Sequence, residues 1–203
     1  MKNILVFDFD GTLADSKKLY IDIIYLFLLR HNYKLSKEKV SRGLGPRLDI
    51  TLENLGVSRK DVGTLTKEIN YAITKKALSL KLCPYVRGSL NKLSKNHTII
   101  LMTNSAKPFI LRILKKHALL KYFSELLCAR FRKKEQGFYY IFKKYKTIPK
   151  NVTYIADKAE DVKIARKVKC QIIIVLAKSW DKNLFKKEKY VIKDMKELLS
   201  KQF

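Results

Sequence analysis

The chain is poor in the residues that build disulfide frameworks and zinc sites. Of its 203 residues, only three are cysteine and three are histidine. Cys83, Cys128 and Cys170 are an odd number and lie far apart, which favours reduced, mostly buried thiols over disulfides or a zinc centre. The histidines also lack the spacing of metal ligands, so we interpret them as structural.

Long apolar runs are lacking as well. No run approaches the roughly 20 apolar residues that a membrane-spanning helix needs. The opening apolar run is short and is followed by acidic residues, unlike a secretory signal peptide. We therefore expect a cytoplasmic protein that does not associate with membranes. A chain of 203 residues with 47% hydrophobic content fits one domain, or a core with one modest insertion.

Acidic residues are scarce relative to basic ones. Eighteen Asp and Glu stand against 44 Lys and Arg, which gives a net charge of +26. The basic residues are densest at 130–150 and 182–201. Such a field attracts anions, from small phosphate esters to nucleic acid; a lysine-rich or heat-adapted surface is the alternative explanation. Because we find no basic-aromatic RNA motif or DNA-binding helix pair, a nucleic-acid partner is not favoured.

Two carboxylates follow an apolar run near the N-terminus. The run Ile4–Phe7 predicts a buried strand of a parallel sheet, and Asp8 and Asp10 come directly after it, followed by Gly-Thr. The carboxyl end of such a strand faces the ligand crevice of an α/β sheet. Two acids packed there repel each other and need a cation between them. A calcium loop is excluded because Leu13 and Leu19 stand where that loop needs Gly and Glu.

The rest of the chain divides into a helical part and an alternating part. From Ser16 to about Leu82 apolar residues recur at helical spacing, as Leu19, Ile23, Leu26 and Phe27 do. After Pro84 the pattern predicts strands at 98–102, 126–129, 152–156 and 172–176, with helices between them and a closing amphipathic helix through 195–199. Alternation of this kind predicts a parallel, three-layer α/β sheet.

Further candidate residues follow two of these strands. Thr103 ends the run Ile-Ile-Leu-Met-Thr-Asn, and its hydroxyl is suited to holding phosphoryl oxygens. Asp157 and Asp161 follow strand 152–156 with the spacing Asp-x-x-x-Asp. Because the carboxyl ends of parallel strands open on the same edge of a sheet, we expect these side chains to meet Asp8.

These motifs, in this order, resemble those of the haloacid dehalogenase superfamily over essentially the whole chain. The sequence looks most similar to the branch of phosphoglycolate-phosphatase-like and β-phosphoglucomutase-like proteins. The resemblance implies a Rossmann-like catalytic core at residues 1–15 and 83–203, with an inserted α-helical cap at residues 16–82. It also implies phosphoryl transfer through an aspartyl-phosphate.

The resemblance suggests a role for each catalytic candidate. Asp8 is the expected nucleophile, and Asp10 is the expected general acid and then base. Thr103 is expected to hold phosphoryl oxygens. Lys133 matches the lysine that offsets negative charge near the start of a helix, although the prolines usual in that motif are missing and Lys134 competes for the assignment.

A site of oxygen ligands with a substrate phosphate is typical of Mg²⁺. The expected ligands are Asp8, the backbone carbonyl of Asp10, and Asp157, while Asp161 would hold metal-bound waters or orient the lysine. The sequence departs from the family pattern at Ala156, where Gly is usual, and at Lys158, where a small or uncharged residue is common.

The expected substrate is a small phosphorylated metabolite. Asn104 is a candidate for substrate binding, and Arg42 and Arg47, in a Gly- and Pro-containing loop of the expected cap, are candidates for binding a carboxylate or a second phosphate. The leading hypothesis is a magnesium-dependent phosphatase, acting as a monomer or weak homodimer. The alternatives are a sugar phosphomutase, a phosphatase of nucleic-acid ends and a basic nucleic-acid-binding protein.

Overall fold

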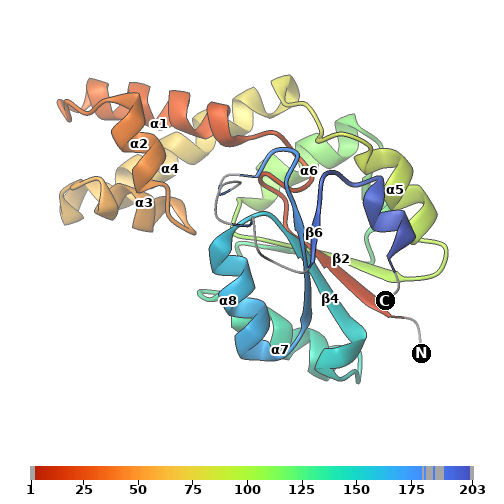
Figure 1. Cartoon of the computed structure of the whole chain (residues 1–203). Coiled ribbons are helices and arrows are strands. Elements are labelled where there is room, and N and C mark those ends of the chain that lie inside the picture. Colours follow the sequence, from red (N-terminus) through yellow and green to blue (C-terminus); the bar gives the residue numbers. More distant parts are fainter. Residues whose placement is uncertain (1–2, 180, 182–184, 186–189, 202–203) are drawn as a thin grey trace.

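A computed structural model describes residues 3–179, 181, 185 and 190–201. A twisted sheet of six strands runs through the larger part of the molecule (Figure 1). Every strand pair is parallel, and the order is β3-β2-β1-β4-β5-β6. The strands are β1 (Ile4–Phe7), β2 (Thr98–Thr103), β3 (Glu125–Cys128), β4 (Val152–Ala156), β5 (Gln171–Val175) and β6 (Val191–Ile192). The prediction of a parallel α/β sheet is confirmed.

The order of the strands reverses direction beside β1. From β1 the chain moves outward through β2 to β3, and then returns to place β4 on the other side of β1. Phe7 at the end of β1 is in register with Leu101 of β2 and Ile155 of β4. The residues that follow these strands therefore emerge beside one another, where α/β sheets bind ligands.

Helices cover both faces of the sheet, and alternate residues of β1 show which helices cover which face. Leu5 and Phe7 belong to the core cluster that includes residues of α5 (Val86–Leu93) and α6 (Lys107–Lys116). Ile4 and Val6 point the other way, into the cluster formed with α7 (Lys134–Lys144) and α8 (Ala159–Val168). A strand buried on both faces explains the unbroken apolar run at the start of the sequence.

Four helices between β1 and β2 form an insert that lies to one side of the sheet (Figure 1). They are α1 (Lys17–Arg30), α2 (Lys37–Gly43), α3 (Leu48–Asn54) and α4 (Arg59–Lys76), followed by the 3₁₀ turn η1 (Ala77–Ser79). The helical spacing in this part of the sequence corresponds to α1, although Leu26 is 50% exposed. The buried side of α1 is formed by Ile24 and Leu28, and Leu26 lies midway between them in sequence, so it points to the opposite side of the helix.

The chain enters and leaves this insert through two adjacent segments. Ala14 and Leu82 form an isolated antiparallel bridge. The amide of Cys83 donates to the carbonyl of Leu13 at 2.9 Å, and the amide of Asp15 donates to the carbonyl of Lys81 at 3.1 Å. These bonds tie the beginning and the end of the insert to each other beside the sheet.

The C-terminal segment differs from its prediction. In place of an amphipathic helix, the structure has the short strand β6 and the 3₁₀ turn η5 (Glu197–Ser200). Met195 and Leu198 are buried as expected, and the carbonyl of Met195 accepts a hydrogen bond from Ser89 Oγ at 2.7 Å. Apolar residues spread over only five positions supply too few turns for a helix. Part of the basic stretch at 182–201 lies outside the described residues.

Two smaller expectations concern thiols and membranes. The three cysteines are free, with Cys83 buried and the other two half-buried. Among the helices that the structure describes, none is both long enough and apolar enough to span a bilayer.

Candidate active site

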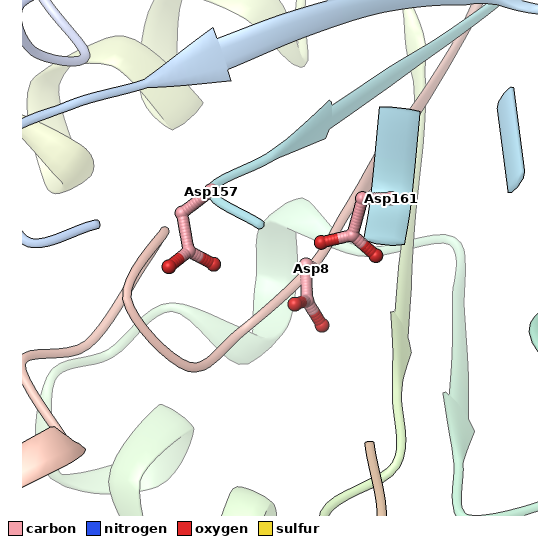
Figure 2. Close-up of side chains that lie close together, drawn as sticks. All are labelled: Asp8, Asp157 and Asp161. Atoms are coloured by element: carbon pink, nitrogen blue, oxygen red, sulfur yellow. The ribbon is translucent and has the colours of Figure 1, made fainter. Parts of the chain in front are cut away.

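Three buried carboxylates meet at the carboxyl edge of the sheet (Figure 2). Asp8 follows β1, Asp157 follows β4, and Asp161 lies in the first turn of α8. One carboxylate oxygen of each lies within 4.8 Å of those of the other two. The expected meeting of these residues, which come from distant parts of the sequence, is confirmed by the structure.

Burial of like charges makes this cluster electrostatically costly. Burial raises the pKa of Asp8 to about 6, with the Lys134 ammonium opposing the rise and the Asp161 carboxylate adding to it. For Lys134, burial acts to lower the pKa, but the carboxylates of Asp161 and Asp8 outweigh it and hold the pKa above its usual value. Lys134 pairs with Asp8 and Asp161, and a cluster of three carboxylates suits a divalent cation.

The lysine at the site is Lys134, which corrects the assignment of Lys133. Lys134 Nζ lies 3.3 Å from Asp8 Oδ1 and 2.9 Å from Asp161 Oδ1, and its side chain is only 9% exposed. Lys133 is the residue before α7, where its backbone amide donates to Gln136 Oε1 at 3.2 Å and its side chain is exposed. Consecutive residues at a helix start point about 100° apart, so only one of the two can face the acids.

Asp161 is held by several donors at once. Its Oδ1 accepts from Tyr154 Oη at 2.7 Å as well as from Lys134, and its Oδ2 accepts from the backbone amide of Lys158 at 3.3 Å. Lys134 Nζ also donates to Tyr154 Oη at 2.7 Å. Asp161 therefore both caps the start of α8 and fixes the position of the lysine, as expected for a residue that orients its neighbours.

Asp10 lies on the tight turn that follows β1, and its side chain points to hydroxyl groups. The amides of Thr12, Leu13 and Ala14 all donate to the carbonyl of Phe9 at 2.8–3.3 Å. Gly11 has φ +81°, a left-handed conformation that glycine adopts without a steric penalty. The Asp10 carboxylate accepts from Ser16 Oγ at 2.6 Å and from Ser105 Oγ at 2.5 Å.

Two other residues of this edge came from the strand-end motif of β2. Thr103 is buried, and its Oγ1 accepts from the backbone amide of Ser105 at 3.1 Å. Asn104 Nδ2 donates to the carbonyl of Pro46 at 2.9 Å, so this side chain joins the sheet edge to the loop between α2 and α3. Asn104 thus contacts the insert, and this contact could not be predicted from the sequence.

A cavity of about 860 Å³ opens over these residues. Asp8, Asp10, Thr103 and Asn104 line it from the edge of the sheet, Lys134 lines it from the start of α7, and residues 44–51 line it from the insert. The cavity therefore lies between the two parts of the molecule and is large enough for a small organic phosphate.

The two arginines expected to reach the substrate differ in their placement. Arg47 lines the cavity, with its Nε 3.1 Å from Asp49 Oδ1, so a neighbouring acid already pairs with it. Arg42 is exposed and lines a separate cavity of about 360 Å³ instead. The structure does not place Arg42 at the main cavity, because α2 ends at Gly43 and only the loop after it turns inward.

Sequence reasoning missed four residues of the site: Thr12, Ser16, Tyr20 and Ser105. Thr12 Oγ1 donates to Asp157 Oδ1 at 3.3 Å, and Tyr20 Oη lies 2.8 Å from Ser105 Oγ. Thr12, Ser16 and Ser105 lie near expected catalytic residues in the sequence, whereas Tyr20 lies in α1, farther from them. Ser105 was the easiest of the four to predict, because it is a hydroxyl residue two positions after Thr103 in the same loop.

Comparisons with known proteins agree with this geometry. The family model of haloacid dehalogenase-like hydrolases matches residues 5–175. The chain belongs to this family. The match spans the whole site, from β1 to the end of β5. No curated protein compared with the chain matches it significantly.

Solved structures share the fold over 98% of this chain. A haloacid dehalogenase-like hydrolase from Bacteroides fragilis superposes with a TM-score of 0.86 at 21% identity, covering 98% of this chain and 100% of that one. A predicted phosphoglycolate phosphatase from Haemophilus somnus gives 0.86 at 18% identity, with 98% and 97% covered. CbbY from Rhodobacter sphaeroides, solved with phosphate, gives 0.82 at 11% identity, with 98% and 96% covered.

Proposed function

We propose that this haloacid dehalogenase-like protein is a Mg²⁺-dependent phosphatase that hydrolyses a small phosphomonoester through an aspartyl-phosphate on Asp8. The observation that carries the proposal is the placement of Asp8. This buried carboxylate follows the carboxyl end of the central strand β1, lines an open cavity and is contacted by Lys134. A carboxylate so placed is suited to in-line attack on a phosphorus atom.

The donor set supports the metal. Asp8, Asp157 and Asp161 offer oxygen ligands only, and their negative charge exceeds what Lys134 supplies. Asp8 and Asp157, with the carbonyl of Asp10, would hold Mg²⁺. Asp161 would support the metal site without binding the ion directly, because Lys134, Tyr154 and the amide of Lys158 already donate hydrogen bonds to its oxygens. When bound, Mg²⁺ neutralises charge on Asp8 and on the phosphoryl group.

The residues of the chain then divide the hydrolysis into two displacements. An oxygen of Asp8 attacks phosphorus, the bond to the ester oxygen breaks, and Asp10 gives its proton to the departing alcohol. Water then attacks the phosphorus and gives a proton to Asp10, the bond to Asp8 breaks, and inorganic phosphate leaves. Lys134 and the Thr103 hydroxyl hold the phosphoryl oxygens in both steps.

The insert fits the role of a cap over the site. We infer that residues 16–82 form this cap and that residues 1–15 and 83–203 form the catalytic core. Residues 44–51 line the cavity opposite Asp8, and Asn104 ties the loop to the sheet edge through Pro46. A cap that narrows the entrance favours a small phosphorylated substrate over a polymer and limits water during phosphorylation of Asp8.

The test is a phosphate-release screen over small alkyl and aryl phosphates and phosphorylated oligonucleotides, with and without Mg²⁺. We expect release from small esters that stops in excess chelator. Asp8→Asn should abolish release while the protein stays folded, because an amide of the same shape is a poor nucleophile. Undiminished turnover by Asp8→Asn would refute the covalent mechanism, and efficient turnover of oligonucleotide ends alone would refute the small substrate.

A further inference from the structure

A chain of hydroxyl groups, half-buried at Tyr20 and buried at Ser105, leads from the insert to Asp10. Ser16 Oγ donates to Asp10 Oδ1 at 2.6 Å, and Ser105 Oγ donates to Asp10 Oδ2 at 2.5 Å. Tyr20 Oη lies 2.8 Å from Ser105 Oγ. Tyr20 belongs to α1 of the insert, whereas Ser105 follows β2 of the sheet. The chain of hydrogen bonds therefore crosses from one part of the molecule to the other.

The direction of donation along this chain is determined by the number of protons. When Asp10 is ionised, Ser105 donates its one hydroxyl proton to Asp10, so the proton between Ser105 and Tyr20 comes from Tyr20. Burial first, and then the Asp10 carboxylate, hold the pKa of Tyr20 well above its usual value, so the phenol keeps its proton. Donation runs from Tyr20 to Ser105 to Asp10.

Packing fixes both ends of the Tyr20–Ser105 pair. The ring of Tyr20 meets Phe109 of α6 edge to face, with ring centroids 6.1 Å apart and an interplanar angle of 85°. The backbone amide of Ser105 donates to Thr103 Oγ1 at 3.1 Å. The edge-to-face contact orients the ring of Tyr20, and the amide bond holds the backbone of Ser105. The Asp10 carboxyl group has a donor on each oxygen, so it cannot rotate about its own bond without losing one of them.

We propose that Tyr20 and Ser105 are positioning residues that fix the plane of the Asp10 carboxyl group for proton transfer to the leaving alcohol. The inference rests on the proposed function, since it assigns these residues to its general acid. It makes helix α1 part of the catalytic machinery through one phenol. General-acid catalysis depends on the proton lying within hydrogen-bond reach of the leaving oxygen, so a carboxyl group left free to rotate transfers it less often.

Leaving groups of different basicity separate this role from a structural one. p-Nitrophenolate departs without a proton, whereas an alkoxide needs one, so only the alkyl ester depends on the acid. We compare kcat/KM, which reports on the first displacement, for p-nitrophenyl phosphate and for the best alkyl phosphate of the screen. For the alkyl ester we expect losses of about tenfold or more in Ser105→Ala and about threefold or more in Tyr20→Phe. For the aryl ester the losses should stay below about twofold.

Three controls make the comparison specific. Tyr25→Phe alters another tyrosine of α1, whose ring faces Lys37, and should leave both esters unchanged. Ser105→Thr keeps the hydroxyl and should restore most of the alkyl activity. In the double variant, Tyr20→Phe should add little to Ser105→Ala, because Tyr20 acts only through Ser105.

Different results would refute the positioning role of Tyr20 and Ser105 and the proposed phosphatase function. Equal losses on both esters, or losses in the double variant that multiply, would overturn the positioning role while leaving the phosphatase intact. A wild-type protein that releases phosphate from neither ester would overturn the proposed function and the positioning role together.

Discussion

Replacing Lys134 by methionine isolates the contribution of the buried ammonium. The substitution keeps an unbranched side chain of similar length but leaves Asp8 and Asp161 without their cation, 3.3 Å and 2.9 Å away. Removing one partner of a buried ion pair typically costs about 3–5 kcal/mol of unfolding free energy. Lys133→Met is the matched control, since Lys133 is exposed and a surface substitution changes stability by about 0.5 kcal/mol or less.

The loss of stability in Lys134→Met should depend on pH. Lys134 lowers the pKa of Asp8, which burial has raised to about 6, so its removal raises that pKa further. When the pKa of an acid is higher in the folded state than in the unfolded state, the acid favours folding most at pH values below its unfolded-state pKa. This contribution to the free energy of unfolding is lost as the pH rises through the pKa of the folded state. The difference from wild type should therefore be largest near pH 8 and shrink toward pH 5.

Urea unfolding in chelator, followed by circular dichroism at both pH values, measures this difference. Mg²⁺ should recover part of the lost stability, because a divalent cation replaces the missing positive charge. The same variant should lose about 10²-fold or more in phosphatase kcat, whereas Lys133→Met should retain it. A larger effect of Lys133→Met than of Lys134→Met, in either assay, would refute the assignment of Lys134 to the site.

Four more outcomes are expected. Asp157→Ala should weaken Mg²⁺ binding, measured by calorimetry, more than Asp161→Ala, because other groups of the protein already engage Asp161. Arg47→Ala should raise KM for an ester with a second anionic group, while Arg42→Ala, outside the main cavity, should not; equal effects would indicate lost stability of the insert. Burial raises the pKa of Cys128 to about 11, so the three free thiols should react slowly with a disulfide reagent at pH 8 until urea is added. The net charge of +26 should give only weak oligonucleotide binding that is lost as salt rises; tight binding at physiological salt would contradict the small-substrate proposal.

The sheet could be predicted because its strands carry a strong local signal. Four residues of β1 are buried on both faces, so the apolar run has no interruption, and the acids follow where it ends. Parallel pairing then brings Asp8 and Asp157 together whatever the intervening sequence, because both follow neighbouring strands of the same register. Short strand-end motifs therefore suffice to predict which residues, distant in the sequence, lie close together in this fold.

The site's lysine and arginines were harder to assign because single positions decide them. Without the usual prolines, the start of α7 could not be fixed to one residue, and a shift of one residue exchanges Lys133 for Lys134. The pairing of Arg47 with Asp49 depends on side-chain directions at the start of α3, which sequence spacing does not determine. The same holds for Tyr20, whose partner lies 85 positions away in the sequence.

The paired segments at the base of the insert have a consequence for how this architecture can diversify. Because Leu13 is bonded to Cys83 and Asp15 to Lys81, the polypeptide leaves the sheet and rejoins it at a single point. Lengthening, shortening or exchanging what lies between changes neither the strand register nor the spacing of the carboxylates. Substrate choice can therefore evolve through the part of the insert beyond α1, because the carboxylates stay in place and α1 keeps Tyr20 beside Ser105.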